Sequence, residues 1–386
     1  MRGHAGAVTD HLRPFRIDVP DAVLIDLRDR LGRTRFPAPA PGEPWQYGTD
    51  LSWLSDLVGY WADGFDWRTH EERLNGWPQF TTEIGGENVH LLHVRSHHED
   101  ALPLIISHGW PGSVLEFVDI IEPLTDPTAH GGEAGDAFHL VVPSLPGFAW
   151  SGPTTQTGIG PKRVAEMWAE LMARLGYGSY GAQGGDWGAL ITTWIGTVDP
   201  AHAVGIHLNM PLARPTPEEM ADLTQREQDA VDAARRYQDD DSGYYKQQST
   251  KPQTVGYALD DSPAGLAAWI GEKFRTWTDC DGEVERSVSR DALLANITAY
   301  WVTSTAHSSA RMYYEHEHGP RPAPYVEVPT GVASFPAEIF RPSRRWCERN
   351  YNIQHWTDYA RGGHFAAMEV PDLLVGDIRA FFRQMR

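Results

Sequence analysis

The pentapeptide GGDWG, residues 184–188, predicts a sharp turn between a strand and a helix that exposes the side chain of Asp186. Glycines lie two residues before and two residues after the aspartate, where so tight a turn leaves no room for side chains. A carboxylate that attacks an sp³ carbon forms an ester, which water can hydrolyse, whereas a serine would form a stable ether. The motif therefore indicates a nucleophilic aspartate, although a glycine-rich loop with a capping aspartate has the same letters.

The chain around this motif alternates between predicted strands and helices. Residues 102–107 (LPLIIS) and 140–142 are short apolar runs, which are typical of buried parallel strands. Residues 164–175 carry apolar side chains at helical spacing, and a further helix is expected from the motif to residue 194. This order predicts an α/β fold with a mostly parallel central sheet and helices on both faces.

The segments outside this core have other patterns. Before it, two amphipathic helices are expected, the first capped by Asp18 or Asp21 and the second beginning near Asp50. A hairpin should follow around residues 85–86. Residues 211–329 are helical in pattern and rich in aromatic side chains, as expected of a cap over the strand ends. We therefore predict an N-terminal helical meander with the first hairpin (1–95), a first part of the core (96–212), a helical cap inserted before the acid-bearing strand (213–328) and a second part of the core (329–386).

A second motif, HGWPGS at residues 108–113, directly follows the LPLIIS strand. From there the backbone N–H groups of Trp110 and Trp187 would point at the oxygen that becomes negative when water attacks the ester. We expect these N–H groups to form an oxyanion hole, and His108, Pro111 and Trp187 to line the substrate pocket. The Trp110–Pro111 bond is a candidate cis peptide, since cis bonds occur at proline in tight turns.

A base and an acid complete the predicted site. His364 lies in the glycine-rich stretch RGGHF, residues 361–365, before the last predicted helix, where it would activate water. A carboxylate located after the cap is needed to orient the imidazole and to stabilise the imidazolium. Glu338, directly after the run 331–334, is the favoured candidate, and Asp358 is the alternative.

These motifs, together with several longer stretches, resemble the microsomal-type epoxide hydrolases, a branch of the α/β-hydrolase superfamily. The resemblance extends over nearly the whole chain and implies that Asp186 is the nucleophile, Glu338 the acid and His364 the base. Besides HGWPGS and GGDWG, the matching stretches are PFRIDVPD (14–21), STKPQTVGYALDDSPAGLAAWIGEKFRTW (249–277), YWVTSTAHSSARMYYE (300–315), GVASFPAEIF (331–340) and RGGHFAAMEVP (361–371).

The resemblance also implies two cap tyrosines that hydrogen-bond the epoxide oxygen and protonate it as the ring opens. Tyr244 lies seven residues before the Lys-Pro pair of the cap, and Tyr313 follows the Ser-Ser-x-Arg-x pattern. Each has a tyrosine neighbour, Tyr245 and Tyr314, so the register could differ by one residue.

The implied reaction is the hydrolysis of an epoxide to a vicinal diol through an ester of Asp186, without cofactor or metal. The aromatic cap favours a hydrophobic, bulky or aryl epoxide. The expected partners are this small molecule and water, with a homodimer as a further option, and a role in natural-product tailoring or in degradation of foreign epoxides is a hypothesis. Two alternatives stay open: a haloalkane dehalogenase with the same kind of nucleophile, and a binding protein of the same fold without turnover.

Composition argues against several other classes. The 33 Lys and Arg residues face 52 Asp and Glu, and the resulting net charge of −19 repels phosphate backbones and anionic lipids. We therefore expect neither a nucleic-acid partner nor a membrane partner. Two cysteines, Cys280 and Cys347, cannot staple a secreted scaffold. Since the sequence also has no pattern of a signal peptide or membrane anchor, it predicts a cytoplasmic protein.

Overall fold

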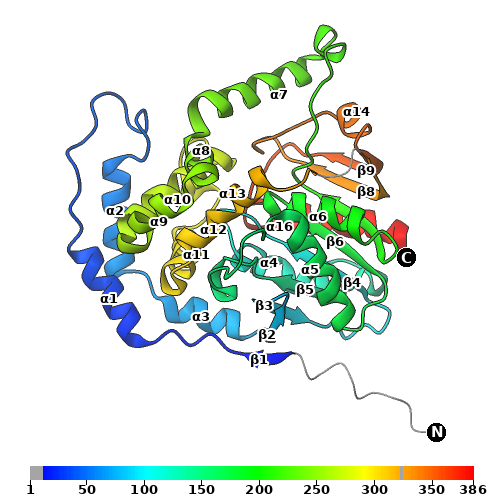
Figure 1. Cartoon of the computed structure of the whole chain (residues 1–386), viewed down its shortest axis with the longest axis horizontal. Coiled ribbons are helices and arrows are strands. Elements are labelled where there is room, and N and C mark those ends of the chain that lie inside the picture. The colour runs from blue at the N-terminus through cyan, green and yellow to red at the C-terminus, as the bar shows by residue number, and fades with distance from the viewer. Residues whose placement is uncertain (1–11, 322–324) are drawn as a thin grey trace.

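The computed structural model describes residues 12–321 and 325–386, and a nine-stranded sheet lies at the centre of the fold (Figure 1). Its strands are β1 (Arg13–Phe15), β2 (Gln79–Ile84), β3 (Glu87–Val94), β4 (Leu102–Ser107), β5 (Phe138–Pro143), β6 (Tyr180–Gly184), β7 (Ala203–Leu208), β8 (Val326–Ser334) and β9 (Tyr351–Asp358). Their order in the sheet is β1-β2-β3-β5-β4-β6-β7-β8-β9. The pairs from β1 to β5 are antiparallel and all later pairs are parallel, so the mostly parallel sheet predicted from the sequence is confirmed.

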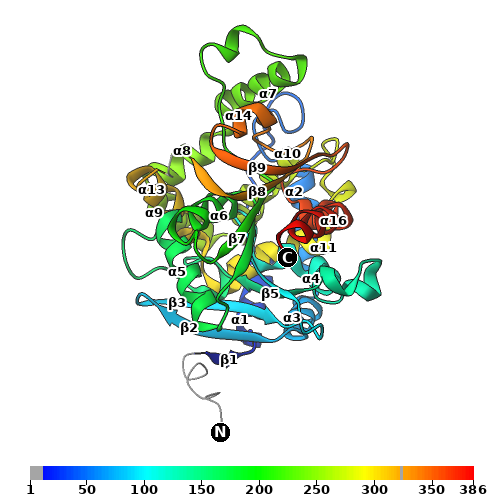
Figure 2. The same cartoon turned by 90° about the vertical axis from the view of Figure 1, so that its right-hand side faces the viewer.

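Helices cover both faces of this sheet (Figure 2). On one face α5 (Pro161–Arg174) packs beside α6 (Trp187–Val198), and on the other α4 (Val118–Thr125) packs against α16 (Pro371–Phe382). A separate cluster of buried apolar side chains fills each of the two layers, because the strands are apolar on both faces. Two short helices, α14 (Arg344–Cys347) and α15 (Ala366–Glu369), complete this part of the chain.

The GGDWG motif forms the predicted turn between β6 and α6. Asp186 has φ 50° and ψ −127°, a left-handed conformation that an aspartate adopts only where its surroundings enforce it. Gly188 permits the close approach of the new helix to the sheet, since a Cβ there would lie 1.9 Å from the carbonyl oxygen of Ser107. The turn therefore presents Asp186 at the carboxyl end of a central strand, where parallel sheets place their ligand sites.

The N-terminal segment contains α1 (Asp21–Gly32), α2 (Leu51–Asp63) and α3 (Trp67–Asn75). Asp50 caps α2 by accepting the N–H groups of Ser52 and Trp53, as predicted. The prediction that Asp18 or Asp21 is the N-cap residue of α1 is wrong. Pro20 occupies the N-cap position, and among the described residues no side chain accepts a hydrogen bond from the first turn of this helix. Asp21 instead lies in the first turn, and its carboxylate forms an ion pair with Arg68. The expected hairpin around residues 85–86 is formed by β2 and β3.

The chain between β7 and β8 is mainly helical and lies beside the core, with one helix projecting at the top of Figure 1. Its helices are α7 (Gln225–Arg236), α8 (Gly243–Thr250), α9 (Pro252–Asp261), α10 (Pro263–Trp277), α11 (Arg290–Thr303), α12 (Ala306–Ser309) and α13 (Arg311–His318). The N-terminal helices α1 and α2 pack against α10. The predicted end of the cap at residue 328 falls inside β8, which begins at Val326.

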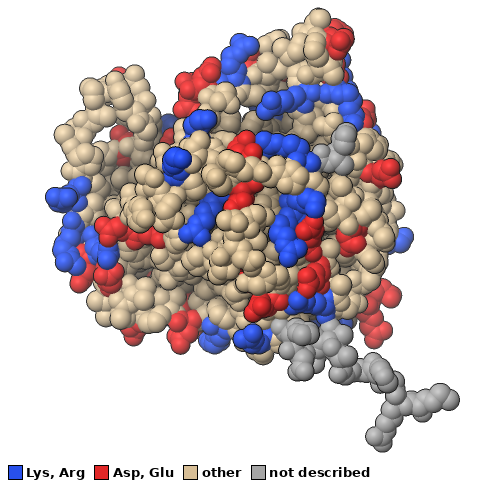
Figure 3. Space-filling view, in the orientation of Figure 1, with Lys and Arg blue, Asp and Glu red and all other residues tan. Residues whose placement is uncertain are grey.

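Basic and acidic side chains are interspersed on the face shown in Figure 3. Several ion pairs join separate elements, for example Arg345 in α14 with Glu227 in α7 at 2.5 Å. Within the described part of the chain, none of the helices combines the length and the apolar character that crossing a membrane requires.

Candidate active site

Backbone donors hold the carboxylate of Asp186. The N–H of Trp110 lies 2.7 Å from its Oδ1, and the N–H of Trp187 also points at the carboxylate. Burial raises the pKa of Asp186, while the imidazole of His364 and the two N–H groups partly offset this rise. The two donors predicted for an oxyanion hole thus meet at the carboxyl group of the predicted nucleophile. Its second oxygen, Oδ2, lies 3.6 Å from Nε2 of His364.

The HGWPGS turn is fixed from the cap side. The Trp110–Pro111 peptide bond is cis, as the sequence suggested. Asn296 of α11 donates to the carbonyl of Pro111 at 2.7 Å, and Tyr300 of the same helix donates to the carbonyl of Gly112 at 2.6 Å. Because the cap binds these two carbonyl groups directly, the position of the Trp110 N–H depends on the cap.

His108 and Pro111 were predicted to line the substrate pocket. His108 lines a small cavity beside Asp186, but both its ring nitrogens contact the backbone: Nδ1 lies 3.0 Å from the carbonyl of Gly109, and Nε2 accepts the N–H of Leu145 at 3.1 Å. Pro111 is not among the described residues that line this cavity. The side chain of His108 therefore holds the turn in place, and its role towards a substrate stays a prediction.

His364 and Glu338 form a buried pair. Nδ1 of His364 lies 2.6 Å from Oε1 of Glu338, which also accepts the N–H of Ile339 at 2.7 Å. Burial by itself lowers the pKa of His364, but the carboxylates of Glu338 and Asp186 outweigh it and raise this pKa to about 9. His364 is therefore protonated at neutral pH and lies between two carboxylates.

Asp358, the alternative acid, lies elsewhere. Its carboxylate forms an ion pair with Arg226 and accepts the indole N–H of Trp356 at 2.8 Å. The guanidinium of Arg226 and these hydrogen bonds outweigh the effect of burial and lower the pKa of Asp358. Glu338, and not Asp358, is therefore the carboxylate that contacts the imidazole.

The phenol rings of Tyr244 and Tyr313 face the oxyanion turn. Tyr244 stacks on Trp110 with ring centroids 4.9 Å apart, and Tyr313 meets Trp187 edge-on at 4.6 Å. The two phenol rings lie 5.7 Å from each other, and both side chains are buried. Burial raises the pKa of each phenol, and the negative charge of Asp186 adds to the rise.

The hydroxyl groups of the neighbouring tyrosines make other contacts, although the ring of Tyr245 packs edge-on against that of Tyr313 with centroids 5.2 Å apart. The hydroxyl of Tyr245 donates to Glu317 at 2.5 Å, and Tyr314 is exposed and stacks on His318 with ring centroids 4.0 Å apart. The hydroxyl of Tyr244 contacts that of Tyr237 at 2.8 Å, whereas Oη of Tyr313 has no hydrogen-bond partner among the described residues. Tyr244 and Tyr313, rather than Tyr245 and Tyr314, are thus the tyrosines whose rings contact Trp110 and Trp187, and their role as acids stays a prediction.

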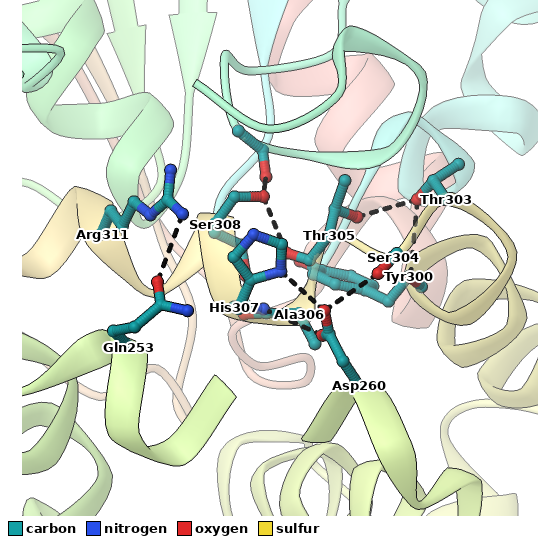
Figure 4. A network of polar contacts seen from close by, with 12 residues as sticks. Gln253, Asp260, Tyr300, Thr303, Ser304, Thr305, Ala306, His307, Ser308 and Arg311 are labelled. Carbon is teal, nitrogen blue, oxygen red and sulfur yellow. Dashed lines mark hydrogen bonds and ion pairs between the residues drawn. The ribbon is translucent and has the colours of Figure 1, made fainter. Parts of the chain in front are cut away.

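A network of polar contacts anchors the helix that precedes Tyr313 (Figure 4). Ser308 of α12 donates to the carbonyl of Gly147 at 2.6 Å, and the hydroxyl of Thr305 accepts the N–H of Ala149 at 3.1 Å. On the cap side His307 contacts Asp260 at 2.6 Å. Since these bonds tie α12 both to a core loop and to α9, the following helix α13 holds Tyr313 in a fixed place.

A second contact joins the cap to the base. The backbone N–H of His364 donates to the carbonyl of Trp277, the last residue of α10, at 2.9 Å. The indole of Trp277 donates to Asp241 at 2.6 Å, and this carboxylate also pairs with the buried ammonium of Lys273, which lies 4.8 Å from the ring centre of Tyr244. Sequence patterns did not reveal these contacts, because they join helices that are distant in the chain.

Glu116 is a further acidic residue at the site that the sequence patterns did not single out. It lines the cavity beside Asp186 together with His108, His364 and Gln183. Its signal in the sequence is a lone carboxylate between Leu115 and Phe117, in an otherwise apolar run after the HGWPGS turn.

Two family descriptions match the chain. The family described as "Epoxide hydrolase N terminus" matches residues 12–117, and that described as "alpha/beta hydrolase fold" matches residues 103–254. Among curated proteins, the chain is similar to a putative epoxide hydrolase of Stigmatella aurantiaca, with 50% identity over 97% of this chain and 86% of that protein. It is also similar to epoxide hydrolase 1 of Sus scrofa, with 38% identity over 98% of this chain and 90% of that protein.

Solved structures show the same relationship over the full length. The epoxide hydrolase of Aspergillus niger superposes with a TM-score of 0.87 and 33% identity, covering 97% of this chain and 96% of that one. The juvenile hormone epoxide hydrolase of Bombyx mori gives a TM-score of 0.90 and 31% identity, covering 98% of this chain and 95% of that one. The N-terminal segment, the core and the cap are therefore all shared with these structures.

Proposed function

Because the chain belongs to the epoxide hydrolase family and has the α/β-hydrolase fold, we propose that it opens a hydrophobic epoxide through a covalent ester of Asp186 and releases a vicinal diol. The observation that carries this mechanism is the convergence of three kinds of group on one carboxylate. Two N–H donors hold the carboxylate, His364 lies beside Oδ2, and two phenols approach from the cap. With relatives that are epoxide hydrolases, the alternatives of a dehalogenase and of a binding protein lose their support.

In the first step Oδ2 of Asp186 attacks one carbon of the epoxide ring. The new C–O bond forms as the strained ring bond breaks, and the departing oxygen takes a proton from Tyr244 or Tyr313. The charge of Asp186 contributes to the raised pKa of both phenols, and ester formation removes that charge. The phenols therefore become stronger acids at the moment when they must donate.

In the second step water attacks the carbonyl carbon of the ester. The negative charge that develops on Oδ1 is stabilised by the N–H groups of Trp110 and Trp187. Alkylation of Asp186 also removes one of the charges that raise the pKa of His364, so the imidazole holds its proton less tightly and acts as a base once it has released that proton to solvent. His364 takes a proton from water and returns it to the departing diol oxygen, and the proton left on Asp186 restores the phenol.

The side chains around the phenols favour an apolar substrate. Trp110, Trp187 and Trp277 present ring faces and edges to the two tyrosines, with centroid distances of 4.6 to 5.8 Å. Aromatic surfaces of this kind bind hydrophobic and aryl groups through buried area and stacking. Such a lining suits an aryl epoxide of natural-product or foreign origin.

Oxygen labelling tests the covalent mechanism directly. With enzyme in excess over epoxide in ¹⁸O water, the first diol should contain only ordinary oxygen, since its added oxygen comes from Asp186. After repeated turnover the peptide that contains Asp186 should carry ¹⁸O when measured by mass spectrometry. Label in the first diol, together with an unlabelled peptide, would show direct attack by water and contradict the proposal.

Removal of either phenol hydroxyl should slow ring opening. We expect Tyr244→Phe and Tyr313→Phe each to reduce the alkylation rate by roughly 10²-fold, because one proton donor to the epoxide oxygen is lost. Single-turnover measurements of epoxide consumption give this rate. The matched controls are Tyr245→Phe and Tyr314→Phe, which remove hydroxyls that point away from the site and should leave the rate unchanged. An equal effect of the control variants would contradict the assignment of the acids.

A further inference from the structure

A small cavity lies beside Asp186 on the side of the core. Its volume is about 10 Å³, which is about the space that one water molecule requires. Asp186, His364, Glu116 and Gln183 contribute polar groups to its wall, and none of the described lining residues belongs to the cap helices. The cavity is therefore separate from the cap tyrosines at which we place the epoxide.

Two glycines of the HGWPGS turn make room for carboxyl groups. A Cβ at Gly109 would lie 2.1 Å from Oδ1 of Asp186, and a Cβ at Gly112 would lie 1.4 Å from Oε1 of Glu116. Glu116 lies in the 3₁₀ turn Val114–Phe117, and the backbone N–H groups of Gly109 and Ser113 point at its carboxylate. The turn that supplies an N–H donor to the nucleophile thus also fixes a second carboxyl group at the same cavity.

Gln183 gives independent evidence that the cavity takes a hydrogen-bond donor. Its side chain is buried, and its Nε2 donates to Asn209 at 3.0 Å, which directs the amide. Its Oε1 has no partner among the described residues. A buried acceptor without a donor costs free energy, and a water molecule in the cavity would satisfy it.

We propose that this cavity holds the water that hydrolyses the ester of Asp186, and that Glu116 aligns this water by accepting its second O–H. The proposal rests on the covalent mechanism described above. One O–H of the water points to Nε2 of His364, the other to Glu116, and a lone pair then faces the carbonyl carbon of the ester. As the water oxygen forms a bond to this carbon, the proton that points to His364 moves to Nε2. The C–O bond between the carbonyl carbon and the diol oxygen then breaks, and the diol oxygen takes the proton from His364.

The electrostatics of Glu116 are compatible with this role. Burial raises its pKa to about 8; the charge of Asp186 adds to the rise, whereas His364 and the N–H groups of Ser113 and Gly109 oppose it. A carboxyl group retains an acceptor oxygen whether or not it is protonated. Glu116 can thus bind the water both before and after ester formation.

The test separates ester formation from ester hydrolysis in the full-length enzyme. Glu116→Met keeps the length of the side chain but removes the acceptor, and should slow hydrolysis of the ester by roughly 10²-fold. Alkylation should stay within about threefold of wild type, because the epoxide lies on the other side of Asp186. Rapid-quench mass spectrometry of the enzyme measures both rates. Glu116→Gln retains an acceptor oxygen and should recover most of the lost hydrolysis rate.

Two further variants control for altered folding. Glu122→Met, at an exposed position of α4, should leave both rates unchanged. Gly112→Ala leaves Glu116 in the chain but forces its carboxyl group to move, so it should reproduce the selective loss of hydrolysis if Glu116→Met does not fold.

The outcomes distinguish a failure of the role proposed for Glu116 from a failure of the covalent mechanism. Unchanged hydrolysis in Glu116→Met, equal slowing of both steps, or a Gln variant as slow as the Met variant would overturn the role of Glu116. If no ester forms in the wild-type enzyme, the covalent mechanism itself fails, whatever the variants at position 116 do.

Discussion

Asp186→Asn is expected to abolish epoxide opening, with kcat reduced by roughly 10⁴-fold or more. An amide oxygen is a poor nucleophile, whereas its size and its ability to accept the N–H of Trp110 are unchanged. The variant should therefore fold normally and bind the epoxide without reacting. Single-turnover kinetics, with intact-protein mass spectrometry to detect the ester, measure the loss.

The matched control for this variant is Asp358→Asn. Asp358 ends the edge strand β9 and pairs with Arg226, so its loss should leave the turnover number near that of wild type. Slow deamidation of the introduced amide would restore the aspartate, and peptide mass analysis must exclude it first. Sustained turnover by an Asp186→Asn enzyme whose amide is intact would rule out a carboxylate nucleophile.

His364→Gln should separate the two steps of the reaction. Asp186 and both phenols remain, so alkylation should proceed, whereas hydrolysis should fall by roughly 10³-fold because no base takes the proton from water. A covalent adduct should accumulate on the enzyme and be located at Asp186 by peptide mass spectrometry. The glutamine amide can still donate to the buried carboxylate of Glu338, which limits the loss of stability.

His318→Gln serves as the control, since this side chain lies exposed on α13. It should turn over normally and show no accumulation of ester. A folded His364→Gln enzyme that consumes epoxide without an adduct would favour direct attack by water.

Local patterns were sufficient for much of the fold and for the choice of nucleophile. The GGDWG turn, the hairpin of β2 and β3 and the cap of α2 by Asp50 each depend on residues that are neighbours in the chain. The N-cap residue of α1 was predicted wrongly. Aspartate is a preferred N-cap residue, and Asp18 and Asp21 both lie close to the start of the helix, so either could fit. Pro20 occupies the N-cap position instead, and its side chain has no hydrogen-bond acceptor.

Long-range contacts were beyond the reach of such patterns. Glu338 follows β8 and Asp358 ends β9, and only the fold shows that Arg226 of α7 pairs with Asp358. Glu116 was overlooked because its proximity to Asp186 arises from the pairing of β4 with β6, which places two separate turns side by side.

The hydrogen bond from the N–H of His364 to the carbonyl at the end of α10 has a consequence for entry and exit. A movement of α10 wide enough to admit a bulky molecule would pull this carbonyl away and release the loop that carries the imidazole. The protein would then be inactive whenever its interior is open, and a trapped ester would meet a competent base only after closure. Opening and chemistry would then be coupled through this one hydrogen bond, and a mutation that weakens the contact should appear as a catalytic defect.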